Sequence, residues 1–222
     1  MKKTPLVLCL LSVFSLSFTT VQAKPQKTED ASVNNDASEQ GKLNLLAKLA
    51  PLNHFSADFE QRVFDEEGNE LQVSSGNLAV QKPNLVNWQT LSPDETLIVS
   101  DGDTLWYYDE FIEQASAYRV SDSIADTPIL LLTSNNDEDW LNYRVKTVNP
   151  NEFQIIAKAT DSKIKSLTVS FEAESSSLNQ LQIEDSTGQI SKITLTNNSF
   201  EKIDQTLFQF TPPQGVFIDD QR

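Results

Sequence analysis

The sequence holds only one cysteine, one histidine and six glycines in 222 residues, and each scarcity excludes a kind of chemistry. A single histidine leaves no His pair for a metal site, and no G-x-S-x-G elbow accompanies it. The glycines form neither a dinucleotide-binding fingerprint nor a P-loop. Residues 135–139 resemble a calcium loop, but Trp140 stands where that loop needs glycine and Lys146 replaces its terminal glutamate. We therefore expect no enzyme activity, no metal and no cofactor, and a surface hydrogen-bonding role for His54.

The cysteine falls within a predicted export signal. Lys2 and Lys3 precede an apolar stretch over residues 6–18, and Val21-Gln22-Ala23 supplies the small residues of a cleavage site. Cys9 lies inside the apolar stretch, so we expect no lipid on it and cleavage after Ala23. The mature domain would then contain no disulfide and depend on its hydrophobic core for stability.

Basic residues are also scarce. The formal charge is −15, and loss of the two signal lysines takes it to −17. Such a surface repels nucleic acid and anionic lipid headgroups. Its plainest consequence is solubility.

The N-terminal part of the mature chain is polar. Residues 24–40 carry no apolar periodicity and are predicted to be a disordered leader. Leucines and alanines at helical spacing over residues 43–50 predict a short helix that Pro51 ends. A single domain is expected over residues 41–222.

From residue 53 onward the apolar period changes to two, which is typical of β-strands. The first strand holds Phe55, Phe59 and Val63. Turn signals such as Glu67-Gly68-Asn69 and Asp101-Gly102-Asp103 recur, and they predict an antiparallel meander. The expected strands cover residues 71–80, 85–91, 96–100, 104–108, 114–120, 140–148, 153–159, 164–171, 178–184 and 192–195.

Two features do not suit an ordinary sheet. Thr127-Pro128 predicts a helix start, and residues 129–132 are four consecutive aliphatics. So short a helix can bury all four only if it is enclosed or fills an apolar cavity. Trp106, Tyr107 and Tyr108 are adjacent in a predicted strand, so both faces of that strand must meet apolar or interfacial surroundings.

These residues resemble a known family. Lys82-Pro83-Asn84-Leu85-Val86-Asn87-Trp88, Pro93-Asp94-Glu95, Val99-Ser100-Asp101-Gly102 and Leu105-Trp106-Tyr107-Tyr108 are similar to the outer-membrane lipoprotein carrier (LolA) family. So are Phe210-Thr211-Pro212-Pro213-Gln214-Gly215-Val216 and the ending Asp219-Asp220-Gln221-Arg222. The resemblance covers the chain from about Leu43 to its last residue.

The resemblance implies a mainly β fold, an incomplete curved antiparallel β-barrel (half-barrel) whose helical lid encloses a hydrophobic cavity. It implies a periplasmic chaperone that takes outer-membrane lipoproteins from an inner-membrane ABC transporter complex and delivers them to an outer-membrane receptor. A monomer is expected. The segment after Thr127 corresponds to the lid helix.

Strand parity and the resemblance together predict the acyl-chain cavity residues, which are Phe55, Phe59, Val63, Trp88, Ile98 and Leu130. Lys82 is the predicted lid latch. It stands where the family usually has an arginine that bonds lid carbonyls, and Val86 replaces a frequent aromatic. Both departures bear on how the lid opens.

Two alternatives stay open, the membrane-anchored receptor of similar fold and a general periplasmic lipid binder. The receptor should carry a cysteine at the end of its signal, where this chain has none.

Overall fold

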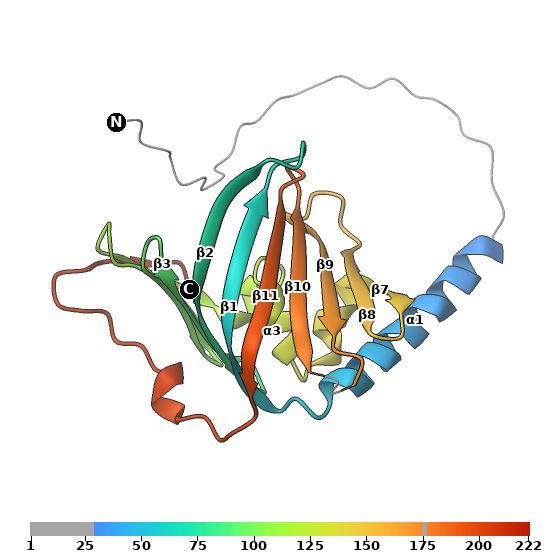
Figure 1. Ribbon diagram of the computed structural model, residues 1–222, viewed down its shortest axis with the longest axis horizontal. Coiled ribbons are helices and arrows are strands. Elements are labelled where there is room, and N and C mark those ends of the chain that lie inside the picture. The colour runs from blue at the N-terminus through green and yellow to red at the C-terminus, as the bar shows by residue number, and fades with distance from the viewer. Residues whose placement is uncertain (1–28, 175–176) are drawn as a thin grey trace.

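The computed structural model describes residues 29–174 and 177–222, and its main element is one twelve-stranded sheet. The strand order is β12-β6-β5-β4-β3-β2-β1-β11-β10-β9-β8-β7. Neighbouring strands are antiparallel, except that β12 runs parallel to β6. The sheet curves strongly and stays open, and the short helix over residues 128–133 lies on its concave side (Figure 1). The predicted half-barrel is confirmed.

The strands follow the predicted ranges closely. They are β1 (His54–Phe64), β2 (Glu70–Gln81), β3 (Leu85–Ser92), β4 (Thr96–Asp101), β5 (Thr104–Asp109), β6 (Gln114–Arg119), β7 (Tyr143–Asn149), β8 (Glu152–Ala157), β9 (Ile164–Phe171), β10 (Leu178–Asp185), β11 (Ile190–Ser199) and β12 (Phe217–Asp220). The helices are α1 (Glu29–Leu49), α2 (Val120–Ser123), α3 (Pro128–Thr133) and the 3₁₀ turns η1 (Asp137–Asn142) and η2 (Gln205–Phe208). Strand β12 was not predicted, and Trp140 belongs to η1 instead of a strand.

Helix α1 corrects the prediction of a disordered leader. It begins at Glu29, so much of the segment 24–40 is helical, while residues 1–28, including the predicted signal, lie outside the described part. Where α1 passes the edge strand β7, contacts with Val145 hold it. Ser38 Oγ accepts a hydrogen bond of 3.0 Å from Val145 N. A Cβ at Gly41 would lie only 2.5 Å from the Val145 carbonyl oxygen, so only glycine allows this approach.

The core lies on the concave face. Inward-facing residues from both halves of the sheet meet there, among them Phe59, Leu78, Leu181 and Ile193, all under 4% exposed. Strand pairing places these residues on one face of the sheet, since Phe59 lies opposite Leu195 on one neighbouring strand and Gly76 on the other. Alternation along each strand therefore gives a continuous apolar inner surface.

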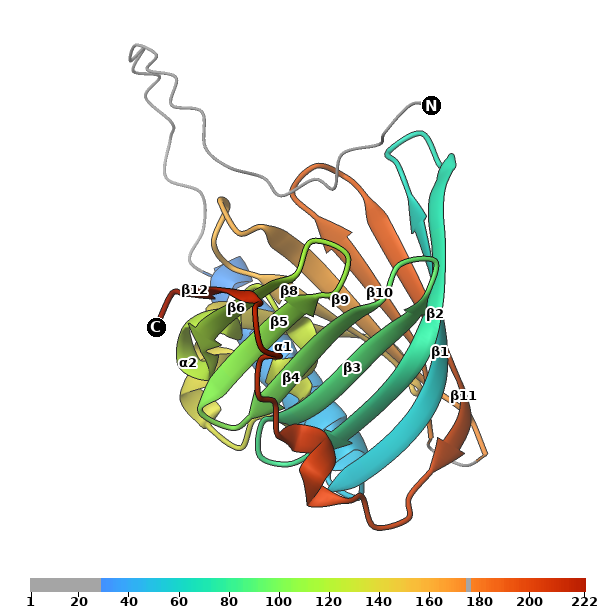
Figure 2. The ribbon, with the colours of Figure 1, turned by 90° about the vertical axis from the view of Figure 1, so that its left-hand side faces the viewer.

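The convex face of β3–β6 is covered by the C-terminal arm, residues 200–222. This arm passes through η2, crosses the outside of the sheet and adds β12 beside β6 (Figure 2). The Phe210 ring lies 5.6 Å from Trp106 and 5.4 Å from Tyr108, measured between centroids. Tyr107 pairs with Ile98 and so faces the other side. Trp106 and Tyr108 therefore pack under the arm, while Tyr107 lies half-buried on the concave side.

Candidate functional site

Helix α3 fills the concave face and defines the candidate site. Pro128 stands in its first turn after Thr127, as predicted. Ile129, Leu130, Leu131 and Leu132 are between 0% and 7% exposed. Six residues form too short a helix to bury every side against one surface, so burial all round requires enclosure by the sheet and α1.

The interior is consequently packed instead of hollow. Two small spaces lie beside α3, and each has a volume of about 10 Å³. One is lined by Leu131 and Tyr143, and the other by Leu132 and Phe55. A space of that size admits about one water molecule. The four aliphatics of α3 therefore occupy the space that was predicted to be a hydrophobic cavity enclosed by a helical lid.

The predicted cavity residues lie mainly together on this face. Phe55, Phe59 and Leu130 belong to the buried core, and Trp88 and Ile98 are half-buried against it. The Phe59 and Trp88 rings are 4.6 Å apart at a tilt of 42°.

Val63 lies apart from that group. It is half-buried, four residues beyond Phe59 along β1, between Gln72 and Ser191. Gly76 makes the packing near Phe59 possible, since a Cβ there would fall 2.9 Å from the end of the Phe59 ring. The glycine could be recognised in the sequence only as an interruption of strand β2.

Beyond α3, a row of half-buried side chains continues the concave face across Trp88, Ile98 and Tyr107, which pair across neighbouring strands. Desolvation raises the pKa of Tyr107, and the nearby Asp109 carboxylate adds to the effect. The ring is therefore neutral at physiological pH and presents an apolar face to this surface.

Lys82 bonds a different helix from the one predicted. Its Nζ donates to the Leu49 carbonyl at the end of α1 over 2.8 Å, and burial lowers its pKa. The contact with α3 comes from the backbone, where Asn84 N donates to Thr133 O over 3.3 Å. The latch prediction is corrected in its partner: the segment after β2 contacts both helices, but the Lys82 ammonium holds α1.

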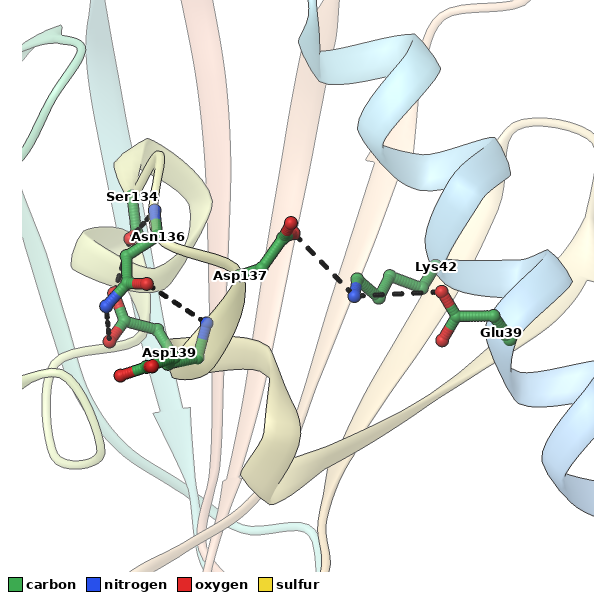
Figure 3. A network of polar contacts seen from close by, with 7 residues as sticks. Glu39, Lys42, Ser134, Asn136, Asp137 and Asp139 are labelled. Atoms are coloured by element: carbon green, nitrogen blue, oxygen red, sulfur yellow. Dashed lines mark hydrogen bonds and ion pairs between the residues drawn. The ribbon is translucent and has the colours of Figure 1, made fainter.

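Polar contacts fasten the ends of α3. Before it, Asp126 pairs with Lys163 at 2.5 Å. After it, Ser134, Asn136 and Asp139 bond one another in a compact turn (Figure 3).

A second contact after α3 reaches α1. Lys42 lies between Glu39 of the same helix and Asp137, at 3.7 and 3.8 Å (Figure 3). Asp137 is highly exposed, and exposed ion pairs contribute little, about 0–1 kcal/mol each.

Chemistry-bearing groups are sparse in the described residues. Within residues 29–174 and 177–222, no three potential metal ligands gather, and no helix is long and apolar enough to cross a membrane. His54 Nε2 lies 3.1 Å from the Phe200 carbonyl, the surface hydrogen bond expected of it. The described concave face offers an apolar surface that can bind apolar groups.

Comparison with known proteins gives a consistent result. A family model described as "Outer membrane lipoprotein carrier protein LolA" matches residues 50–211. An "Outer-membrane lipoprotein carrier protein" of Serratia proteamaculans (strain 568) is 37% identical over 222 residues, covering both chains completely. One of Yersinia pestis bv. Antiqua (strain Angola) is 36% identical over 86% of this chain and 93% of its own.

A solved structure shares the fold at low identity. The crystal structure of an uncharacterized conserved protein from Thermus thermophilus aligns with a TM-score of 0.51 at 9% identity. It covers 82% of this chain and all of that one.

Proposed function

Because the chain belongs to the outer-membrane lipoprotein carrier family, we propose that it shields the acyl chains of lipoproteins against the concave face of its half-barrel. The family carries lipoproteins through the periplasm, a non-catalytic role. The observation that supports our proposal is the burial of the four aliphatic side chains of α3. They occupy the position that an acyl chain would take on the concave face.

The magnitudes support an exchange between α3 and cargo. Burying four aliphatic side chains is worth about 1.5–3 kcal/mol each, or roughly 6–12 kcal/mol in all. One acyl chain of about fifteen methylenes gains roughly 12 kcal/mol on leaving water. The two quantities are comparable, so an acyl chain can displace α3 and α3 can later help to expel it.

In this scheme Phe55, Phe59, Val63, Trp88, Ile98 and Leu130 contact the acyl chains. Trp88 and Ile98 are half-buried while α3 is closed and would be met first. Phe55, Phe59 and Leu130 become available only when α3 moves. The carrier works as a monomer in the periplasm, between an inner-membrane ABC transporter complex and an outer-membrane receptor.

Binding of a triacylated cysteine lipopeptide to the purified mature protein tests the proposal. We expect saturable binding of one lipopeptide, and co-purification of lipoproteins from the periplasm identified by mass spectrometry. A protein that binds phospholipid or free fatty acid as well as the lipopeptide would instead be a general lipid binder.

A further inference from the structure

Four large apolar side chains stand in solvent at one corner of the half-barrel. Phe111 and Ile112, in the β5–β6 turn, are 86% and 54% exposed, and Phe217 and Ile218, in β12, are 66% and 52% exposed. We call these four residues the edge patch. Grouped exposure of this kind marks an interaction site more often than an accident of the surface.

The turn that carries Phe111 and Ile112 is held in place. Asp109 Oδ1 accepts hydrogen bonds from both of their backbone N–H groups, at 3.0 and 3.2 Å. Glu113 has a φ of +52°, which is uncommon for a residue with a side chain. Its carbonyl accepts from Phe217 N at 2.9 Å and so joins the turn to β12. An unfavourable backbone conformation next to exposed apolar side chains indicates that the exposure of these side chains has a function.

The outer edge of β12 carries backbone N–H and C=O groups that point away from the sheet. Phe217 N donates to the Glu113 carbonyl just before β6, and Gln221 N donates to the Ala117 carbonyl of β6. Because bonding alternates along a strand, the N–H and C=O groups of Ile218 and Asp220 point away from β6. No further strand pairs with them in the part of the chain that the structure describes.

The opposite edge of the sheet, at β7, is covered by a helix. There α1 lies along β7 and Ser38 Oγ accepts from Val145 N. One edge of the sheet is thus covered, as edges usually are, while the other is bordered by apolar side chains.

Part of the edge patch continues the concave face, because Phe217 lies on that face whereas the adjacent Ile218 faces the convex side. The half-buried row of Trp88, Ile98 and Tyr107 reaches Ser116 on β6, which pairs with Tyr107 on one side and Asp219 of β12 on the other. Phe217 pairs with Gln114, on the same face, one row away. An acyl chain lying on the row at Trp88 therefore has the outer edge of β12 at the end of its path.

We propose that the polypeptide that follows the acylated cysteine of the cargo adds as a strand to β12, with the edge patch gripping its side chains. This inference rests on the proposed function, and it describes how the carrier binds the polypeptide part of the lipoprotein. Strand addition reads the main chain and is tolerant of sequence, which suits a carrier of different lipoproteins. Glu110, Glu113 and Asp219 around the patch favour neutral or basic segments over acidic ones.

The test compares two synthetic triacylated cysteine lipopeptides on the mature protein. One ends one residue after the cysteine, and the other continues for twelve residues of alternating lysine and threonine. The parent should bind the long lipopeptide about tenfold more tightly, the effect of one or two net main-chain hydrogen bonds. A long lipopeptide with alternate amides methylated keeps the charge, and it should bind like the short one.

The matched variants are Ile218→Pro and Ile218→Val. Proline removes an N–H that points away from β6 and is tolerated on such an edge, whereas valine keeps it. Ile218→Pro should abolish the tenfold difference while binding the short lipopeptide as the parent does, and Ile218→Val should retain the difference.

Three results would contradict the inference. The first is equal binding of long and short lipopeptides to the parent, and the second is an undiminished difference in Ile218→Pro. Both leave the proposed function standing. Failure of both lipopeptides to bind the parent would remove the proposed function and this inference together.

Discussion

Replacing Leu130 with alanine should make the protein less stable when empty, yet tighter for acyl chains. Leu130 is fully buried in α3, and a Leu→Ala change in a packed core costs about 2–5 kcal/mol. That loss falls on the closed state, in which α3 lies against the sheet. The state with α3 displaced lacks these packing contacts, so there Leu130→Ala removes only the contact of Leu130 with the acyl chain, a smaller loss.

The affinity change follows from the population of the binding-competent state. If binding needs α3 to leave, each kcal/mol removed from the closed state raises the competent fraction. Taking about 2 kcal/mol as the relative loss, the apparent Kd for an acyl ligand falls about 30-fold. Chemical denaturation of the empty protein should meanwhile show a lower free energy of unfolding.

Leu181→Ala is the matched control. Leu181 is 1% exposed in the same core, but it belongs to β10 and stays in place when α3 moves. It should lower stability comparably without improving affinity. Titration of each variant with a triacylated cysteine lipopeptide that carries a fluorophore measures the difference. Unchanged or weaker binding by Leu130→Ala would refute the idea that α3 competes with the ligand.

Three further predictions concern other parts of the molecule. Acyl ligand should alter the fluorescence of Trp88, and Trp88→Phe should lose the ligand-dependent part; an equal response in the variant would place the ligand elsewhere. Lys82→Leu should leave loading intact but slow transfer of cargo to the receptor, because Leu49 O loses its donor and the closed empty state weakens by about 1 kcal/mol. Lys82→Arg should restore transfer, and complete transfer by Lys82→Leu would exclude the latch. Asp220 has a pKa lowered to about 2, chiefly by its hydrogen bond with Arg222, so its stabilising effect is present above the unfolded pKa near 3.8 and lost as pH falls through about 2. NMR titration should show that pKa rising toward 3.8 in Arg222→Gln.

The strands could be predicted because their information is local. Alternation fixed Phe55, Ala57 and Phe59 on one face, and turn residues such as Gly102, with a φ of +100°, marked the reversals. The four aliphatics after Pro128 likewise predicted enclosure, which α3 confirms. These signals depend on neighbouring residues, and the sequence carries them directly.

The missed features depend on distant partners. Helix α1 meets β7 at Ser38 and Gly41, and no apolar period in residues 29–40 indicates that contact. Strand β12 has four residues and exists through pairing with β6 across the sheet. Lys82 could be placed beside the helices, but its hydrogen-bond partner depended on where α1 ends. In addition, a filled interior and an empty cavity give the same pattern of apolar residues in the sequence, so the pattern does not distinguish them.

The way in which α3 is held explains why it can serve as a temporary occupant. The sheet is joined by continuous ladders of backbone hydrogen bonds, which an apolar ligand cannot replace. The contacts that hold α3 are of another kind, because its ends carry an exposed ion pair, Asp126 with Lys163, and one longer backbone bond to Asn84. Most of its attachment is therefore apolar burial, which is non-directional and can be supplied equally by methylenes. A carrier needs a rigid wall and a lining that cargo can replace, and this division between directional and non-directional contacts provides both.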